Sequence, residues 1–293
     1  MKTRTLFTCA ISLVVGTLGT SCGTSDTTVS PQRWVLTISD EFDGEDGAPP
    51  SPELWNIETG YGFEDSGWGN DEWQLYTDST DNVRQEGGNL VITALCEADP
   101  CGKRDGTITS ARITTQNLFE QEYGRFEARI RLPEGAGLWA AFWMLGANVE
   151  EVGWPASGEI DIMENVGRQP ERVLATVHGP GYSAGNSISN WLDLPDGETF
   201  ADDFHFFAVE WDPSRITFSV DGQVQDGVVV GGEVYSIVRS ANVTGLDGEW
   251  VFNNEFFVIL NLAVGGTLGG SVDDTAFPAE VLVDYVRIFE RAP

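Results

Sequence analysis

Short apolar runs separated by clusters of Gly, Asn, Asp and Pro recur along the chain from Trp34 onward. Runs of this length are typical of β-strands, and no long stretch carries apolar residues at helical spacing. The predicted strands are residues 89–96, 110–115, 123–131, 139–145, 159–164, 173–178, 205–211, 216–220, 256–262 and 281–290. Asp221-Gly222 follows one of them as a hairpin signal. Many strands with no helices between them predict an all-β sandwich of antiparallel sheets, with little helix.

The first 22 residues have the layout of an export signal. Positive charges at Lys2 and Arg4 precede a mostly apolar run over residues 6–18, which is too short to span a membrane. Small residues then precede Cys22, as in a bacterial lipoprotein cleavage site, although Gly19 stands where such sites usually carry Leu. We expect an exported bacterial protein, either extracellular or anchored in the outer membrane through a lipid on Cys22, and the pattern favours lipidation.

Residues 23–33 are polar and aperiodic, and we interpret them as a tether. No further linker, repeat or shift in composition follows, so residues 34–293 are predicted to form a single β-sandwich domain that acts as a monomer. A chain of 293 residues with 41% hydrophobic residues can fill the core of such a domain. Its 34 glycines and 13 prolines agree with a turn-rich β protein.

The formal net charge is −30, from 46 acidic and 16 basic residues. Such a surface repels nucleic acid, because affinity there depends on neutralising phosphates. It also disfavours sulfated or uronic polysaccharides, so a neutral substrate is favoured. A competing interpretation, compatible with the first, is that the charge only keeps an exported protein soluble.

Cys96 and Cys101 are the cysteines that follow the leader. They stand close enough in sequence to close a small loop disulfide, which an exported protein permits. Zinc is a weaker alternative, because a site with both cysteines would also need His178 and His205, which are far apart in sequence. We therefore expect the disulfide.

Three carboxylates fall within the six residues from Glu159 to Glu164, with Asp161 between them. Alternate side chains of a strand share a face, so Glu159 and Asp161 point the same way, whereas Glu164 would enter the core. An unpaired carboxylate in the core is costly. A β-bulge near Ile162-Met163 would return Glu164 to the face of the other two acids.

Three neighbouring acids on one sheet face suit glycoside hydrolysis. Mutual repulsion raises the pKa of at least one carboxyl. The reaction needs an ionised carboxylate to attack the anomeric carbon and a protonated acid for the leaving oxygen, and a separation of about 5–5.5 Å between them gives retention of configuration. Two other interpretations stay open at this point: an exposed acidic strand on an acidic protein, and a calcium site.

The surrounding sequence resembles family 16 glycoside hydrolases, in particular the bacterial laminarinases. The family signature Glu-X-Asp-X-X-Glu matches Glu159 to Glu164, preceded by Trp154-Pro155-Ala156 and followed by Asn165. Further similar motifs, in the family's order, are Gly67-Trp68-Gly69-Asn70, Ser110-Ala111-Arg112-Ile113, Tyr123-Gly124-Arg125-Phe126-Glu127-Ala128-Arg129, Gly137-Leu138-Trp139-Ala140-Ala141-Phe142-Trp143-Met144-Leu145, His178-Gly179-Pro180-Gly181-Tyr182, Asn261-Leu262-Ala263-Val264-Gly265-Gly266 and Asp284-Tyr285-Val286-Arg287. The resemblance implies a curved, concanavalin-like jelly roll with an open concave cleft for a chain of sugars.

The resemblance also implies roles for individual residues. Glu159 would be the nucleophile, Glu164 the acid/base and Asp161 their assistant, with no cofactor for catalysis. The positions that would line the cleft are Asn70, Arg112, Trp139, Trp143, Trp154 and His178, and for each of them a packing role competes. Many relatives hold a structural calcium ion away from the cleft, and the matching ligands would be Asp284, Glu41 and the backbone at Gly88. After Asn70, where relatives commonly carry a second Asn and a Glu, this chain has Asp71-Glu72-Trp73.

Together the acids, the charge and the resemblance predict a retaining endo-β-1,3-glucanase that cleaves neutral β-1,3-glucan by double displacement. A β-1,3-1,4-glucanase and a transglycosylase are alternatives with the same site. A lectin-like module that binds β-glucan is the non-enzymatic alternative, although such a module would be expected to lose one of the three acids.

Overall fold

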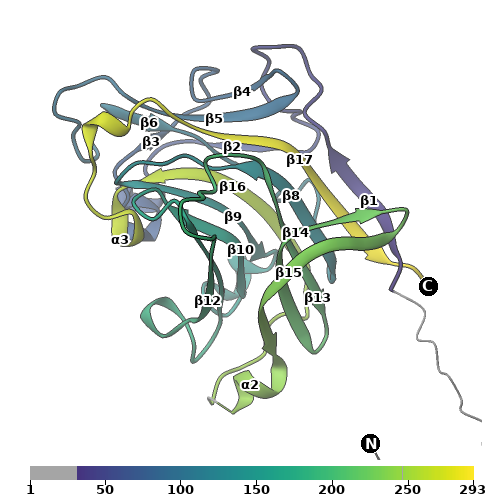
Figure 1. The fold of residues 1–293 in the computed structure, drawn as a ribbon. Coiled ribbons are helices and arrows are strands. Elements are labelled where there is room, and N and C mark those ends of the chain that lie inside the picture. The colour runs from purple at the N-terminus through teal and green to yellow at the C-terminus, as the bar shows by residue number, and fades with distance from the viewer. Residues whose placement is uncertain (1–31, 246) are drawn as a thin grey trace, which may run out of the picture. The chain divides into compact units, whose positions relative to one another are not determined.

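The computed structural model describes residues 32–245 and 247–293. These residues fold into two β-sheets packed face to face (Figure 1). The sheets hold ten and seven strands. The predicted export signal, with Cys22, and the tether up to residue 31 lie outside the described residues. Within the described part, no helix has both the length and the apolar character needed to cross a bilayer.

The ten-stranded sheet has the order β15-β14-β13-β8-β17-β5-β6-β3, with β1 beside β17 and β4 beside β5. Its strands are β1 (Trp34–Asp40), β3 (Leu75–Tyr76), β4 (Val83–Glu86), β5 (Asn89–Cys96), β6 (Ile108–Ser110), β8 (Gly124–Arg131), β13 (His205–Asp212), β14 (Arg215–Gln225), β15 (Val228–Arg239) and β17 (Ala279–Arg291). The pairing is antiparallel except between β3 and β6, which run parallel.

The seven-stranded sheet has the order β12-β11-β10-β9-β16-β7-β2. Its strands are β2 (Asn56–Glu58), β7 (Arg112–Thr114), β9 (Leu138–Gly146), β10 (Glu159–Val166), β11 (Arg172–His178), β12 (Ile188–Asp193) and β16 (Phe256–Val264). The α-helices of the described part are short: α1 (Val149–Val152), α2 (Ser240–Thr244) and α3 (Gly266–Gly269). The predicted all-β sandwich with little helix is confirmed.

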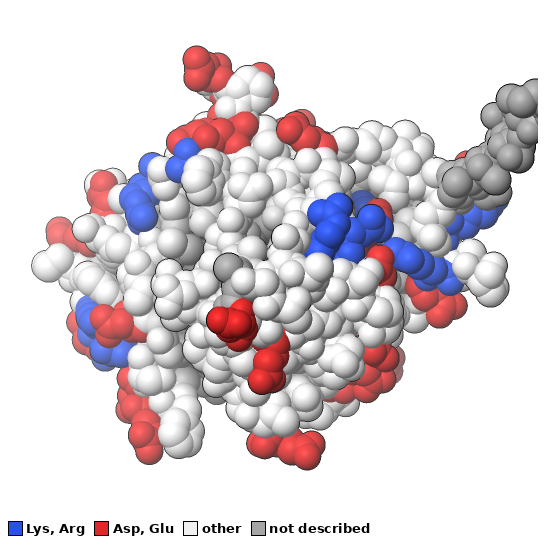
Figure 2. Space-filling model, turned by 90° about the horizontal axis from the view of Figure 1, so that it is seen from below, with Lys and Arg blue, Asp and Glu red and all other residues white. Residues whose placement is uncertain are grey.

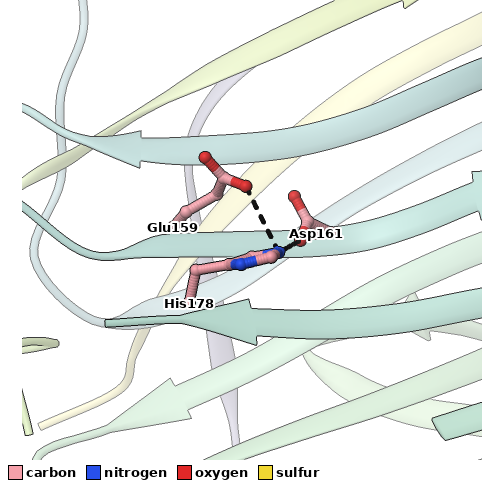
Figure 3. A group of neighbouring side chains, drawn as sticks. All are labelled: Glu159, Asp161 and His178. Atoms are coloured by element: carbon pink, nitrogen blue, oxygen red, sulfur yellow. Dashed lines mark ion pairs between the residues drawn. The ribbon is translucent and has the colours of Figure 1, made fainter. Parts of the chain in front are cut away.

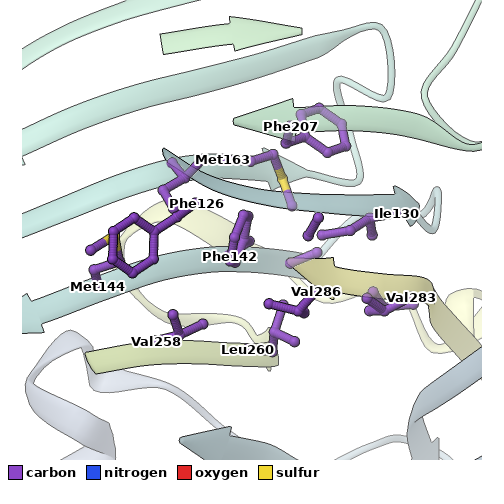
Figure 4. Close-up of a cluster of buried hydrophobic side chains, with 14 of the residues drawn as sticks. Phe126, Ile130, Phe142, Met144, Met163, Phe207, Val258, Leu260, Val283 and Val286 are labelled. Atoms are coloured by element: carbon purple, nitrogen blue, oxygen red, sulfur yellow. The ribbon is translucent and has the colours of Figure 1, made fainter. Parts of the chain in front are cut away.

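The core lies between the two sheets and is filled by the inward half of each strand's alternating side chains. On β11, Val173, Ala175 and Val177 are buried in it. Figure 4 shows part of the core, where Phe142 from β9 and Phe126 from β8 belong to the same cluster. Burial of one such side chain contributes roughly 1.5–3 kcal/mol to folding. The other half of the alternating residues on the seven-stranded sheet points away from the core, and we call this outer surface the site face.

Two of the predicted elements differ in the structure. The predicted strand 110–115 is two strands, β6 and β7, because the chain passes at Ala111 from one sheet to the other. The predicted hairpin turn at Asp221-Gly222 is wrong: Gly222 pairs with Gly231 inside the β14–β15 ladder, and the turn falls at residues 226–227. The pattern also missed strands β1, β2, β3, β4, β12 and β15.

Cys96 and Cys101 form the predicted disulfide, with Cα atoms 6.0 Å apart. It closes a five-residue separation at the end of β5. On the surface, acidic side chains are spread over the face shown in Figure 2, while Lys and Arg side chains form smaller groups. This distribution agrees with the strongly acidic composition.

Candidate active site

Strand β10 contains the predicted bulge. Its pairing with β9 shifts between Asp161 and Met163, and Ile162 and Met163 are both buried in the core. Because two successive residues point inward, Glu164 returns to the face that carries Glu159 and Asp161. The charge of Glu164 acts on both of the other acids, as expected for neighbours on one face. Both the bulge and the clustering of the acids are confirmed.

His178, at the end of β11, lies opposite Glu159 and reaches two of the acids (Figure 3). Its Nε2 lies 3.5 Å from Glu159 Oε1 and 3.2 Å from Asp161 Oδ2. Its Nδ1 accepts a hydrogen bond of 3.1 Å from the backbone N–H of Ala184. A ring nitrogen that accepts carries no proton, so the neutral ring holds its proton on Nε2, facing the carboxylates.

Two indole N–H groups hold the outer carboxylates. Trp154 Nε1 donates to Glu159 Oε2 at 3.0 Å, and Trp139 Nε1 donates to Glu164 Oε1 at 3.1 Å. Thr176 Oγ1 donates to the other oxygen of Glu164 at 3.3 Å. These bonds fix the direction of both carboxylates. Trp154 is also 47% exposed, so part of its ring faces solvent.

Burial dominates the protonation of the three acids. Burial, and then the negative charge of Asp161, raise the pKa of Glu159 from 4.5 to about 8. Burial and the neighbouring Glu164 carboxylate raise the pKa of Asp161 well above its ordinary range. Burial also raises the pKa of Glu164, against the opposing effects of His178 and the bonds from Trp139 and Thr176. The group therefore retains at least one proton at neutral pH, and a general acid needs such a proton.

Arg112 from β7 forms a cluster with two tryptophans on the side of β10 that faces away from β11. Its guanidinium carbon lies 4.6 Å from the ring centre of Trp68 and 4.8 Å from that of Trp143, and the guanidinium pairs with Glu58 of β2. Cation–π contacts of this kind contribute about 0.5–2 kcal/mol each. Trp143 pairs with Asp161 across the strands, so the cluster borders the acids on the site face. Contact between these residues and a sugar stays a prediction.

A buried polar network lies behind Asn70, and the sequence analysis missed most of it. Glu72, only 4% exposed, accepts hydrogen bonds from Asn70 Nδ2, Gln74 Nε2 and Tyr76 Oη. Tyr76 Oη accepts in turn from Asn261, whose Oδ1 receives the Trp143 N–H at 2.8 Å. Burial raises the pKa of Glu72. In the sequence, residues 71–73 stood out because they depart from the family's pattern. That departure gave no sign that Glu72 is buried.

Tyr235 from β15 is a second residue that the sequence did not single out. Its hydroxyl donates to the backbone carbonyl of Ile162 at 3.3 Å, within the bulge of β10. The carbonyl of a bulged residue is left out of the regular ladder, so an added donor stabilises the bulge. No motif predicts this contact, because it joins strands of different sheets.

Comparison with known proteins agrees with this geometry. Residues 70–229 match the model of glycosyl hydrolases family 16. The chain belongs to this family. A β-glucanase of Rhodothermus marinus is 38% identical over 99% of this chain and 95% of its own length, and a glucan endo-1,3-β-glucosidase of Cryptopygus antarcticus is 41% identical over 81% and 83%. The endo-β-1,3-glucanase structure from Pyrococcus furiosus is 42% identical over 89% of this chain and 96% of that one, with a TM-score of 0.79.

As a family 16 member, the chain is a glycoside hydrolase. The alternative that its three acids form a calcium site is therefore disfavoured. Glu159, Asp161 and His178 offer ligand atoms within 4.8 Å of one another, the one such group among residues 32–245 and 247–293. Calcium prefers oxygen ligands, whereas one of these atoms is an imidazole nitrogen. The hydrogen bonds and raised pKa values suit proton transfer instead.

The predicted structural calcium ligands lie together but are engaged by arginines. Asp40 pairs with Val286 and Leu90 with Val283, so the strand ends bring Glu41, Gly88 and Asp284 into one neighbourhood. Both oxygens of Glu41 accept from Arg287, at 2.9 and 2.8 Å, and Asp284 Oδ2 accepts from Arg129 at 2.9 Å. A calcium ion would have to displace these guanidinium groups, and the site stays a prediction.

Proposed function

We propose that this family 16 chain is a retaining endo-β-1,3-glucanase that hydrolyses internal bonds of neutral β-glucans. The observation that carries the proposal is the bulge of β10, which places Glu159, Asp161 and Glu164 together on the site face. The relatives named above, a β-glucanase and two endo-1,3-β-glucanases, support β-1,3-glucan as the substrate.

In this mechanism, the Glu159 carboxylate attacks the anomeric carbon. The bond to the leaving sugar breaks, and its electron pair stays on the leaving oxygen, which takes a proton from Glu164. In the second step a water molecule gives a proton to Glu164 while its oxygen attacks the anomeric carbon, and Glu159 leaves as a carboxylate. The hydrogen bond from Trp154 and the proximity of His178 oppose the raised pKa of Glu159, while burial raises the pKa of Asp161 and Glu164. The three acids share their protons, and the reactive form is the one in which Glu159 is ionised and Glu164 is protonated.

The first test is the product profile of the purified domain on laminarin and on barley mixed-linkage glucan. Fast release of short β-1,3-oligosaccharides from laminarin, slower action on barley glucan and a β-anomer as the first product by NMR would support the proposal. Preferred cleavage of barley glucan would instead indicate a β-1,3-1,4-glucanase. Binding of laminarin without cleavage would indicate a lectin-like module.

Glu159→Gln tests the nucleophile directly, because an amide cannot form the glycosyl-enzyme bond. We expect at least a thousandfold loss of kcat with an unchanged circular dichroism spectrum. Glu53→Gln, at an exposed loop position, is the matched control and should retain activity. Turnover like that of the unmodified protein in Glu159→Gln would refute the assignment.

We also propose that the protein is exported as a monomer and anchored through Cys22. The sequence of the leader supports the proposal, and a disulfide such as Cys96–Cys101 persists in the oxidising compartments outside the cytoplasm. In a bacterial host, the mature protein should carry lipid on Cys22 and fractionate with membranes. Cys22→Ser should move it to the soluble fraction, and an unlipidated, soluble native product would contradict the anchor.

A further inference from the structure

Two of the ten tryptophans, all of which lie in the described residues, are exposed. Trp154 has a clear reason, because its N–H holds Glu159. Trp191 on β12 is 55% exposed and takes no part in the site described above. Tryptophan is usually buried to a large extent, and an exposed indole on the sheet that carries the acids is a candidate contact for the ligand.

Trp191 lies in line with the proposed acid on the site face. Glu164 pairs with Leu174 of β11, and Leu174 pairs with Trp191 of β12, which ends the same sheet (Figure 1). Directly paired residues of antiparallel strands share a face. Neighbouring strands lie about 4.8 Å apart, so two strand steps put the backbone of Trp191 about 10 Å from that of Glu164. A sugar chain that crosses the strands from the acids would therefore reach Trp191 within a few sugar units.

The alternation of β12 confirms the direction of the indole. Ile188 and Leu192 pack against the core, so Trp191, one residue before Leu192, points to the site face. An apolar ring there breaks the usual pattern, in which the solvated face of an edge strand is polar.

An arginine–aspartate ion pair lies beside the indole and adds no net charge. The Arg172 guanidinium carbon lies 5.3 Å from the ring centre of Trp191. Arg172 is itself fixed by two bonds to Asp193, Nε to Oδ1 at 2.5 Å and Nη2 to Oδ2 at 2.7 Å. The ion pair neutralises itself, so the surface around Trp191 suits an uncharged ligand.

We propose that Trp191 is a sugar-stacking platform that extends the substrate-binding face over β11 and β12. The inference rests on the proposed function and adds to it a residue that selects longer chains. The C–H face of a neutral pyranose packs on the indole, and such contacts are apolar and independent of charge. Ser189, on the same face of β12, offers a hydroxyl beside the ring for the polar edge of the sugar.

The test compares Trp191→Ala with Trp191→Phe on laminaritriose and laminarihexaose. Trp191→Ala should lower kcat/KM for the hexaose about threefold to tenfold, chiefly through KM, as expected for loss of one aromatic contact. The loss should be smaller for the triose, and Trp191→Phe should recover most of it. Leu36→Ala removes an equally exposed apolar side chain on β1 of the other sheet and is the control for surface truncation.

An equal loss for both substrates, or none for the hexaose, would overturn the proposal. A loss accompanied by a lower unfolding midpoint than that of Leu36→Ala would assign Trp191 to stability and also overturn it. If the unmodified protein hydrolyses neither these oligosaccharides nor laminarin, the proposed function fails instead. Laminarin affinity then decides about Trp191: a weaker Kd in Trp191→Ala supports the platform, and an unchanged Kd refutes it.

Discussion

Replacing Glu159 by Gln should stabilise the protein, and the gain should grow with pH. Burial and the charge of Asp161 raise the pKa of Glu159 from 4.5 to about 8. Between these pH values the unfolded chain has lost the proton that the folded protein still holds. Stability therefore falls as pH rises through this interval, because the folded state binds more protons than the unfolded state. Gln has no proton to lose and escapes the effect.

The size of the effect follows from the interval. Each pH unit between 4.5 and about 8 removes about 1.4 kcal/mol from the free energy of unfolding, so the full interval corresponds to about 5 kcal/mol. Part of the shift comes from the charge of Asp161, whose own pKa is raised, so a protonated Asp161 weakens the repulsion. We therefore expect Glu159→Gln to gain about 3–5 kcal/mol over the original protein at pH 8 and less than about 1 kcal/mol at pH 5.

Urea unfolding at pH 5, 6.5 and 8, followed by tryptophan fluorescence, measures the difference. Glu53→Gln is the control, because its exposed carboxyl should give the same small difference at all three values. If Glu159→Gln raises the free energy of unfolding equally at pH 5 and pH 8, or lowers it at pH 8, the reasoning that ionised Glu159 destabilises the folded protein is refuted. The predicted outcome is a trade of stability for activity, as is common at catalytic sites.

Three further predictions concern other parts of the site and the fold. Trp139→Phe removes the N–H that favours ionised Glu164, so the pKa of Glu164 should rise and the alkaline limb of the kcat/KM profile should move to higher pH; an unmoved limb would contradict the role of this bond. Arg112→Ala should raise KM for laminarin about tenfold by loosening the stacked tryptophans, and an unchanged KM would assign Arg112 to packing alone. Replacing Cys96 and Cys101 by Ser should lower the free energy of unfolding by about 2 kcal/mol, as loop closure over so short a segment implies. Urea unfolding of the original protein with and without reductant, beside the double variant, measures this loss, and equal stability of all three would contradict the prediction.

Local sequence rules predicted the chemistry of β10 because they act on neighbouring residues. The spacing of Glu159, Asp161 and Glu164 allows the three acids to share one face only through a bulge, and the cost of a buried carboxylate excludes the regular strand. The disulfide was predictable for the same reason, since its cysteines are close in sequence.

The same rules failed where two solutions are locally equivalent. Asp221-Gly222 and Asp226-Gly227 both satisfy the hairpin rule, and the pairing of β14 with β15 selects the second. Likewise, nothing in the period of residues 110–115 shows that the chain changes sheets at Ala111. Such choices depend on which strands pack together over the whole domain.

The sandwich, the three acids with their bulge and the small disulfide could all be predicted, because alternation, charge burial and short spacing are properties of adjacent residues. The surroundings of the acids depend on how distant strands pack, and the folded structure alone reveals them. It placed His178 between Glu159 and Asp161, stacked Arg112 between two tryptophans, buried Glu72 behind Asn70 and left Trp191 exposed on the site face. Cross-strand neighbours are set by the order and register of the strands, and these are fixed by the packing of the whole core rather than by any single segment.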